Sequence, residues 1–215
     1  MNSIVFVTGT GTEVGKTFEA AAVLRELQGR FITVAARKPA QSFDPADPAP
    51  HDSEVLADAT GETTDEICPS HRCYPIAMAP PMAADALQLP RITLADLIGE
   101  LAPSPAEVMI VEGAGGLRSP IAHDGDGLDL IGGLATKVVV IVADAGLGTI
   151  NAVLLTVDAI AHRHTVPVVV MLNRFDDANA LHIANAAYLQ AHTPGPIVHN
   201  IITLTDEILN IHRGF

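Results

Sequence analysis

The chain has 215 residues, enough for one sizeable core, and no stretch has the composition of an interdomain linker, so residues 1–215 are expected to form a single domain. With 12 basic and 25 acidic side chains, its formal net charge is −13, which disfavours nucleic acid and anionic membranes as partners. The longest apolar run, Val138–Ala143, is far shorter than the ~20 residues that cross a bilayer. The N-terminus shows no signal pattern, so a cytoplasmic location is expected.

Strand-like and helix-like segments alternate along the chain. Near-continuous apolar runs predict buried strands at Ile4–Thr8, Phe31–Ala36, Val108–Val111, Val138–Ala143 and Val166–Leu172, with a weaker sixth at Ile197–Ile202. Helical patterns lie at Lys16–Gln28, Ser53–Ala59, Leu94–Leu101, Ile150–His162 and Ala178–Ala191. This alternation predicts an α/β fold with a mostly parallel sheet and helices on both faces. The crossover between the second and third strands is long and rich in proline, which is typical of a functional or disordered loop.

A glycine-rich stretch, Gly9–Thr17, joins the first strand to the first helix. Such a turn directs backbone N–H groups at a phosphate, Lys16 adds a charge for the outer phosphates, and Thr17 is placed to ligate Mg²⁺. Five residues separate Gly9 from Gly15, which departs from the usual phosphate-loop spacing, and a tight turn without a ligand is the alternative. The strand before the loop and the helix after it favour a nucleotide site. Its predicted contacts are Thr12, Glu13, Val14, Gly15, Lys16, Thr17 and Phe18.

Charged residues follow two further strands, at the sheet edge where ligands bind in open α/β folds. Lys38 comes after the second strand and would project over the phosphate loop, although a solvated strand-end lysine is the alternative. Asp52 opens a short helix as either an N-cap or a metal ligand. Glu112 ends the third strand, as do acidic residues that hold Mg²⁺ in nucleotide hydrolases, and the glycines of Gly113–Gly116 allow a ligand to approach closely.

Polar turns follow the fourth and fifth strands as well. Gly146–Asn151 leads into a helix N-terminus that either receives an anionic group or is a flexible connection capped by Thr149 or Asn151. Asn173 ends the fifth strand and is followed by Arg174, and an asparagine amide suits the reading of a purine edge. The sequence alone leaves both roles open.

The cysteines and histidines show no metal-ligand pattern. Cys68 and Cys73 fit neither a Cys-x-x-Cys redox motif nor, without further ligands, a zinc site, so two reduced thiols are expected. The nine histidines are expected to be structural or solvated.

Taken together and in this order, the motifs resemble dethiobiotin synthetase, a family of the P-loop NTPase superfamily. The resemblance runs from residue 4 to about 175 and includes the five-residue gap in the phosphate loop. It rests on Gly9–Thr17, Lys38-Pro39 with Ser42, Asp52-Ser53, Val111–Gly116 and Gly148–Asn151. Departures are Gly11, where many members carry Asp, Phe43, where Gly is usual, and the part after Asp176, which matches no motif.

The resemblance implies a ligase of biotin biosynthesis that forms C–N bonds. An amine of 7,8-diaminononanoate takes up CO₂ as a carbamate, the carbamate attacks the γ-phosphate of ATP, and the second amine closes the ureido ring. Lys38 would hold the carbamate, and Lys16 with Mg²⁺ would stabilise the phosphate charge. The family pattern implies that the metal is surrounded by Thr17, Asp52 and Glu112. It implies that the nucleotide site also includes Asp52, Glu112, Gly113, Ala114, Gly115, Asn173 and Arg174. It implies that the substrate is bound by Ser42, Gly148 and Asn151, with Asn151 acting across a homodimer interface.

Three other protein classes share the phosphate loop. A regulatory ATPase switch of the partitioning type, the main alternative, carries a lysine early in the loop, where this chain has Gly11. An amidotransferase-type ligase normally needs a glutaminase domain, for which no room is expected after the sixth strand. Asn173-Arg174-x-Asp176 is one residue from the guanine-reading motif of GTPases, but no Asp-x-x-Gly follows the third strand.

Overall fold

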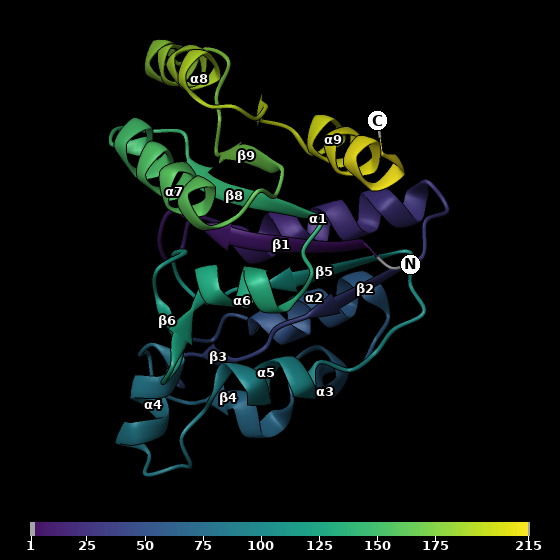
Figure 1. Ribbon diagram of the computed structural model, residues 1–215, viewed down its shortest axis with the longest axis vertical. Helices are drawn as coiled ribbons and strands as arrows, with labels where there is room; N and C mark the ends of the chain where they lie inside the picture. The colour runs from purple at the N-terminus through teal and green to yellow at the C-terminus, as the bar shows by residue number, and fades with distance from the viewer. Residues whose placement is uncertain (1–2, 215) are drawn as a thin grey trace.

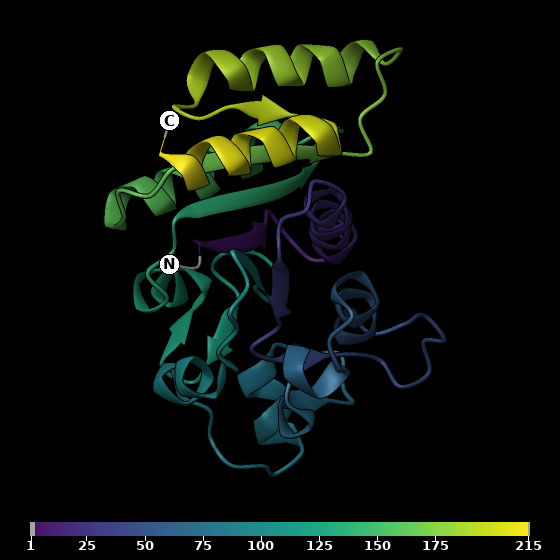
Figure 2. The same ribbon diagram turned by 90° about the vertical axis from the view of Figure 1, so that its right-hand side faces the viewer.

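The centre of the computed structural model, which describes residues 3–214, is a six-stranded sheet (Figure 1 and Figure 2). All neighbouring strands are parallel, in the order β10-β9-β8-β1-β5-β2. The strands are β1 (Ser3–Gly9), β2 (Val34–Arg37), β5 (Val108–Glu112), β8 (Val138–Asp144), β9 (Val168–Asn173) and β10 (Ile197–Val198). The predicted parallel α/β architecture is confirmed.

Helices cover both faces of this sheet. One face carries α1 (Lys16–Gly29), α2 (Asp52–Thr60) and α9 (Ile201–Arg213), and the other carries α6 (Gly127–Gly133), α7 (Thr149–Arg163) and α8 (Ala180–His192). Successive residues of β1 alternate between the two cores, since Val5 and Val7 pack on the α1 side and Phe6 on the α7 side. Burial on both faces explains why the strands are almost entirely apolar. Within residues 3–214 no helix combines the length and apolar character needed to span a membrane.

The long crossover from β2 to β5 folds into a small substructure beside the sheet, below it in Figure 1. Its two short strands, β3 and β4, pair in parallel. The elements of this substructure are β3 (Gln41–Ser42), α3 (Thr64–Ile67), the 3-10 turn η1 (Ser70–Arg72), β4 (Cys73–Tyr74), α4 (Pro80–Ala86) and α5 (Leu94–Glu100). A hairpin of β6 (Pro120–Ala122) and β7 (Gly125–Asp126) follows β5. The proline-rich segment is thus built into the fold.

The strand predicted at Phe31–Ala36 is wrong at its start, because β2 begins at Val34. Phe31 lies in the turn that ends α1, where its N–H donates to the carbonyl of Gln28 and its φ is 64°. Its side chain is 94% exposed. The apolar character of Phe31 predicts a buried strand position, but the backbone turns at this residue.

The strand predicted at Ile197–Ile202 covers only Ile197–Val198. Asn200 is the reason, since its side chain accepts a hydrogen bond from the N–H of Thr203 at 2.9 Å and starts α9. The other predicted strands and helices agree with the structure within two residues at each end. The helices α3, α4, α6 and α9 were not predicted.

The buried carboxyl group of Glu19, on the core side of α1, makes stability depend on pH. Burial raises the pKa of Glu19 from 4.5 to about 7. Between these values the unfolded chain releases a proton that the folded chain keeps, so stability falls as pH rises and levels off above about 7. In Glu19→Gln, the decrease in the free energy of unfolding between pH 4.5 and 8 should be smaller than in the wild type by up to about 3 kcal/mol. Urea unfolding across this pH range measures the difference.

Glu207→Gln on α9, where the side chain is half-buried, is the matched control and should keep the pH dependence of the wild type. Equal pH dependence in the wild type and Glu19→Gln would contradict the assignment.

Candidate active site

The loop between β1 and α1 is shaped by two glycines that admit no side chain. Gly15 has a φ of 95°, and a Cβ there would lie 2.0 Å from Nδ2 of Asn173. A Cβ on Gly9 would lie 2.7 Å from Cγ2 of Val14. The glycines therefore let the loop fold tightly onto itself and against the end of β9, as a phosphate-binding turn requires.

Lys16, the first residue of α1, extends its side chain into this loop. Its Nζ donates to the carbonyl of Gly11 at 3.0 Å, and the residue is buried. Burial, followed by the nearby charge of Lys38, lowers the pKa of Lys16. An anion in the loop would reverse both effects, since it would pair with the ammonium.

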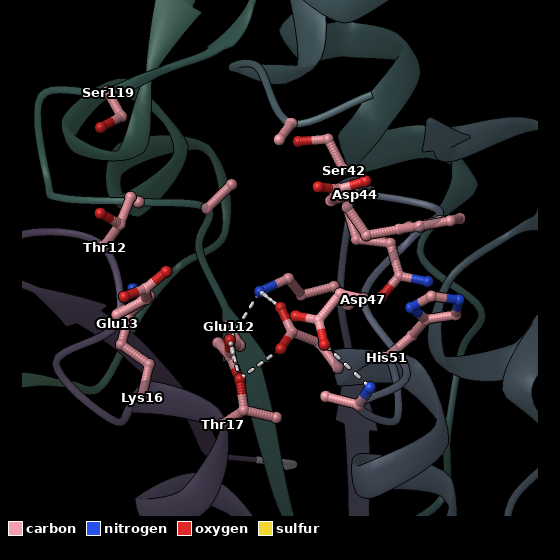
Figure 3. Close-up of a pocket in the computed structure, with 18 of the residues that line it drawn as sticks. Thr12, Glu13, Lys16, Thr17, Ser42, Asp44, Asp47, His51, Glu112 and Ser119 are labelled. Carbon is pink, nitrogen blue, oxygen red and sulfur yellow. Dashed lines mark hydrogen bonds and ion pairs between the residues drawn. The ribbon is translucent and has the colours of Figure 1, made fainter. Parts of the chain in front are cut away.

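Lys38, Glu112, Asp52 and Thr17 meet between the phosphate loop and the substructure (Figure 3). Nζ of Lys38 lies 2.6 Å from Oε1 of Glu112, 2.6 Å from Oδ2 of Asp52 and 3.1 Å from the carbonyl of Gly113. Oγ1 of Thr17 lies 2.7 Å from Oδ1 of Asp52 and 2.9 Å from Oε1 of Glu112, and its single hydrogen serves one of them at a time. Four residues that are far apart in sequence thus form one network.

The charges in this network depend on one another. Burial tends to lower the pKa of the Lys38 ammonium, but Glu112 and Asp52 outweigh burial and raise this pKa overall. Burial tends to raise the pKa of Asp52, yet its bonds to Lys38 and Thr17 lower it overall. Burial raises the pKa of Glu112, although the positive charge of Lys38 acts to lower it. Two carboxylates share one ammonium, so the network favours a further positive charge.

The oxygen atoms of this network fit a hard cation such as Mg²⁺. Oε2 of Glu112 is buried and has no hydrogen-bond partner among the described residues. Together with Thr17 and Asp52 it offers the oxygen ligands that Mg²⁺ prefers, leaving other positions for water and phosphate oxygens. No cluster of three or more His, Cys, Asp or Glu suited to a metal occurs in residues 3–214.

A cavity of about 880 Å³ lies over the network, a size typical of small-molecule sites. Figure 3 shows Glu13 and Lys16 on one side, Ser42 and His51 on the other, and Glu112 between them. Of the predicted residues, the cavity is lined by Thr12, Glu13, Gly15, Lys16, Thr17, Phe18, Lys38, Ser42, Asp52, Glu112, Ala114, Gly115 and Arg174. Val14, Gly113, Asn173, Gly148 and Asn151 are not among the lining residues described.

Two alternatives for the strand-end residues are wrong. Lys38 is not a solvated lysine, since its side chain is 2% exposed and fully paired. Asp52 is not an N-cap, because His51 holds that position and its N–H donates to Glu54 at 2.7 Å. Asp52 is the first residue of α2, and its carboxylate faces Thr17 and Lys38.

Asn173 and Arg174 fasten the phosphate loop to the end of β9. Nδ2 of Asn173 donates to the carbonyl of Val14 at 2.9 Å, and its Oδ1 accepts from the N–H of Arg174 at 2.7 Å. The Arg174 guanidinium donates to the carbonyl of Glu13 and to Asp144, each at 3.0 Å. Both ends of the Asn173 amide are therefore engaged by protein, and its contact with a purine stays a prediction.

The start of α7 lies apart from the cavity lining. Gly148 is the N-cap residue with a φ of 93°, so neither Thr149 nor Asn151 caps the helix. Oγ1 of Thr149 is buried without a partner among the described residues. A polar group at a helix N-terminus without a partner suits an anionic ligand.

Several cavity residues were not predicted. Ser119 lines the cavity, and its Oγ accepts from the N–H of Gly116 at 3.0 Å. Asp44 and Asp47 line it from the proline-rich segment, where Phe43 stacks on His51 at 3.8 Å between ring centroids. The proline-rich composition of that segment is the only signal that pointed to them.

The Lys38–Glu112 pair should be strongly coupled in stability. Breaking a buried ion pair from one side typically costs about 3–5 kcal/mol, reduced here because Asp52 still pairs with Lys38. We expect Glu112→Gln and Lys38→Met each to destabilise the fold, and the double variant to cost at least about 1 kcal/mol less than their sum. Urea unfolding of the four proteins measures this coupling.

The exposed pair Arg25–Asp58, whose atoms lie 2.7 Å apart, provides the matched cycle with Arg25→Gln and Asp58→Asn. Its coupling should stay below about 1 kcal/mol. A coupling at Lys38–Glu112 no larger than this would show that the buried contact contributes little.

Comparison with known proteins identifies the family of the chain. The family model described as "AAA domain" matches residues 3–206. The chain is 38% identical over 172 residues to the ATP-dependent dethiobiotin synthetase of Anaeromyxobacter dehalogenans (strain 2CP-C), covering 79% of this chain and 76% of the relative. It is 36% identical over 160 residues to that of Corynebacterium efficiens, covering 73% and 69%.

Solved structures show the same fold at low identity. Cobyrinic acid a,c-diamide synthase from Mycobacterium smegmatis, with a bound ATP analogue and magnesium, has a TM-score of 0.58 at 14% identity, over 100% of this chain and 97% of its own. A plasmid partition protein from Borrelia burgdorferi with AMPPNP has a TM-score of 0.55 at 12% identity, over 98% and 97%. These structures share the fold alone, and the sequence relatives show that the chain belongs to the ATP-dependent dethiobiotin synthetase family.

Proposed function

We propose that this chain uses ATP and Mg²⁺ to close 7,8-diaminononanoate and CO₂ into dethiobiotin, with release of ADP and phosphate. The meeting of Lys38, Glu112 and Asp52 in the cavity of about 880 Å³ carries the proposal. One wall of the cavity is the phosphate loop, and the opposite wall carries Ser42. A nucleotide and a second substrate would thus face each other across charged groups, as a reaction governed by positioning requires.

Lys38 holds the carbamate in this proposal. Its three N–H donors meet three acceptors, on Glu112, Asp52 and Gly113. A carbamate oxygen would most readily replace Asp52, whose side chain is 40% exposed. Lys38 would then align that oxygen with the γ-phosphate, and Lys16 would stabilise the charge that develops on the phosphate.

Thr17, Asp52 and Glu112 would hold Mg²⁺, directly or through water. When bound, the ion supplies positive charge against the phosphate oxygens. Oε2 of Glu112 is available to it, while Oε1 is shared by Lys38 and Thr17. Glu112 would therefore connect the metal side of the site to the carbamate side.

Ser42 and the start of α7 would bind the diamine. Ser42 lines the cavity, and its hydroxyl donates to the carbonyl of Met78. Gly148 and Asn151 do not line the described cavity, and in this proposal they reach the substrate carboxylate from a second subunit. We therefore propose that the active species is a homodimer with shared sites.

We also propose what the protein binds, where it acts and how it is organised into domains. The partners are small molecules, and the net charge of −13 argues against nucleic acid and anionic membranes. The protein acts in the cytoplasm, and residues 1–215 work as one domain. The regulatory ATPase alternative gains no support from a cavity that places a buried lysine beside the phosphate loop.

The reaction itself is the first test. The purified chain with diaminononanoate, bicarbonate, Mg²⁺ and ATP should give the ureido product by mass spectrometry, and chelation of the metal should abolish it. ATP hydrolysis should depend on the diamine. Hydrolysis that proceeds equally without diamine, and without ureido product, would favour the regulatory ATPase.

The two lysines should fail in different ways. Lys16→Gln should weaken ATP binding and chemistry together. Lys38→Gln should keep ATP affinity within a few-fold without diamine, yet lose about 3 kcal/mol or more of transition-state stabilisation. Calorimetry and single-turnover ring closure measure the two effects, and Lys38→Arg should restore little because a planar guanidinium does not replace a compact ammonium.

If Lys38→Gln and Lys16→Gln lose ATP binding equally, Lys38 belongs to the nucleotide site and not to the carbamate site. Arg25→Gln, at an exposed position outside the described cavity lining, is the control that should change neither measurement.

A shared site also predicts complementation between two inactive variants. In a mixed dimer of Lys38→Gln and Asn151→Ala chains, one of the two sites has both native residues. Random exchange of subunits should therefore restore about a quarter of the wild-type activity. No recovery after exchange confirmed by mass spectrometry would show that both residues serve the same subunit's site.

A further inference from the structure

Cys68 and Cys73 lie together outside the cavity, although five positions separate them in the chain. Cys68 ends α3, Cys73 begins β4, and the turn η1 brings their Sγ atoms to 3.6 Å. Cys68 is buried, whereas Cys73 is partly exposed. A disulfide needs an S–S distance of about 2 Å, so the two sulfurs would have to approach each other by about 1.6 Å to bond.

The surroundings of the two sulfurs make them chemically unequal. Sγ of Cys73 lies 3.6 Å from Sγ of Cys68 and accepts a hydrogen bond from Nε2 of Gln41 at 3.2 Å. The hydrogen bond from Cys68 lowers the pKa of Cys73 to about 7, and Gln41 and the nearby His71 act in the same direction against burial and Asp65. The hydrogen bond to Cys73, followed by burial, raises the pKa of Cys68. These effects favour the thiolate on Cys73 and the proton on Cys68.

We propose that Cys68 and Cys73 form a peroxide-sensitive dithiol that closes to a reversible disulfide. The Cys73 thiolate attacks one oxygen of hydrogen peroxide, the O–O bond breaks, and Cys73 becomes a sulfenic acid as hydroxide takes up a proton and leaves as water. Cys68 sulfur then attacks the Cys73 sulfur, the S–O bond breaks, and the thiol proton leaves with the hydroxyl as a second water. Two thiols are oxidised, one peroxide is reduced, and a thiol reductant reverses the reaction.

The dithiol is joined to the wall of the cavity by direct contacts. Gln41, which donates to Cys73, also exchanges two hydrogen bonds with Ser53, at 2.8 and 3.0 Å, beside Asp52. In the pairing of β3 with β4, Gln41 lies opposite Cys73 and Ser42 opposite Tyr74. Drawing Sγ of Cys73 toward Cys68 would remove an acceptor from Gln41. Resting on the proposed function, we infer that oxidation changes the binding of the diamine more than that of ATP.

Intact mass spectrometry of the native chain tests the chemistry without any activity measurement. After peroxide treatment and alkylation under denaturing conditions, the wild type should have lost the mass of two hydrogen atoms and should resist alkylation at both cysteines. Peptide mapping should show Cys68 linked to Cys73, and dithiothreitol should restore both thiols. Absence of this link, or irreversible oxidation of Cys73 beside an unmodified Cys68, would overturn the proposal.

Two matched variants test the order of events. Cys68→Ser should stop at a Cys73 sulfenic acid that dimedone traps, whereas Cys73→Ser should leave the buried Cys68 unreacted. The reverse pattern would overturn the assignment of roles, and circular dichroism of both variants checks the fold.

The effect on the site is measured separately. Oxidised wild type should show a several-fold change in KM for the diamine with an unchanged Kd for ATP, and peroxide should change neither value in Cys68→Ser/Cys73→Ser. An unchanged KM in a fully disulfide-linked protein would overturn the link to substrate binding. If no ureido product forms even in the reduced protein, the proposed function fails while the mass result still decides the dithiol.

Discussion

The buried contact between Lys38 and Glu112 is the interaction on which the candidate site depends. Neither side chain reaches solvent to any useful extent, so the Glu112 carboxylate depends on Lys38 for its partner charge, and Lys38 depends on Glu112 together with Asp52. The sheet supplies this condition, since the pairing of Arg37 with Val111 brings the ends of β2 and β5 side by side. The N–H of Lys38 also donates to the carbonyl of Ile67 at 2.7 Å, which fixes the backbone just past the strand.

The strand order explains why the other groups gather at the same place. β1 and β8 are neighbours in the sheet, and the chain leaves β1 toward β2 but leaves β8 toward β9, on the opposite side, which is the position where ligands bind in doubly wound folds. The phosphate loop follows β1, Glu112 ends β5, and Asn173 ends β9. Asn173 then reaches back to the loop, so the shape of the phosphate cradle depends on a strand two places away in the sheet.

The sequence predicts an element well where buried apolar residues recur regularly along it. It predicts poorly where a single contact determines the local structure. Strands covered on both faces gave long apolar runs such as Val138–Ala143, and these were located within a residue or two. Phe31 and Ile201 misled because they are apolar but lie in a turn and a helix. β3 and β4 have two residues each, too few for any periodicity, and their pairing depends on contacts distant in sequence.

The same distinction applies to the site. Strand-end positions identified Lys38 and Glu112, because parallel strands bring their carboxyl ends to one edge. Nothing in the residue order showed that Lys38 would pair with both carboxylates, or that the Asn173 amide would be used by the loop itself. Such partners depend on side-chain directions that are set only when the strands and loops pack together.

The two departures from the family pattern have different physical meanings. A Cβ on Gly11 would meet no atom within 4 Å, so packing around the Cβ position does not require glycine there. Phe43 does more than fill space, because its ring stacks on His51, the residue before Asp52. A glycine could not make this contact. The stack ties the segment after Ser42 to the start of α2, and it therefore restrains the loop between a predicted substrate residue and a predicted metal ligand, lowering the entropy that ligand binding would otherwise have to remove.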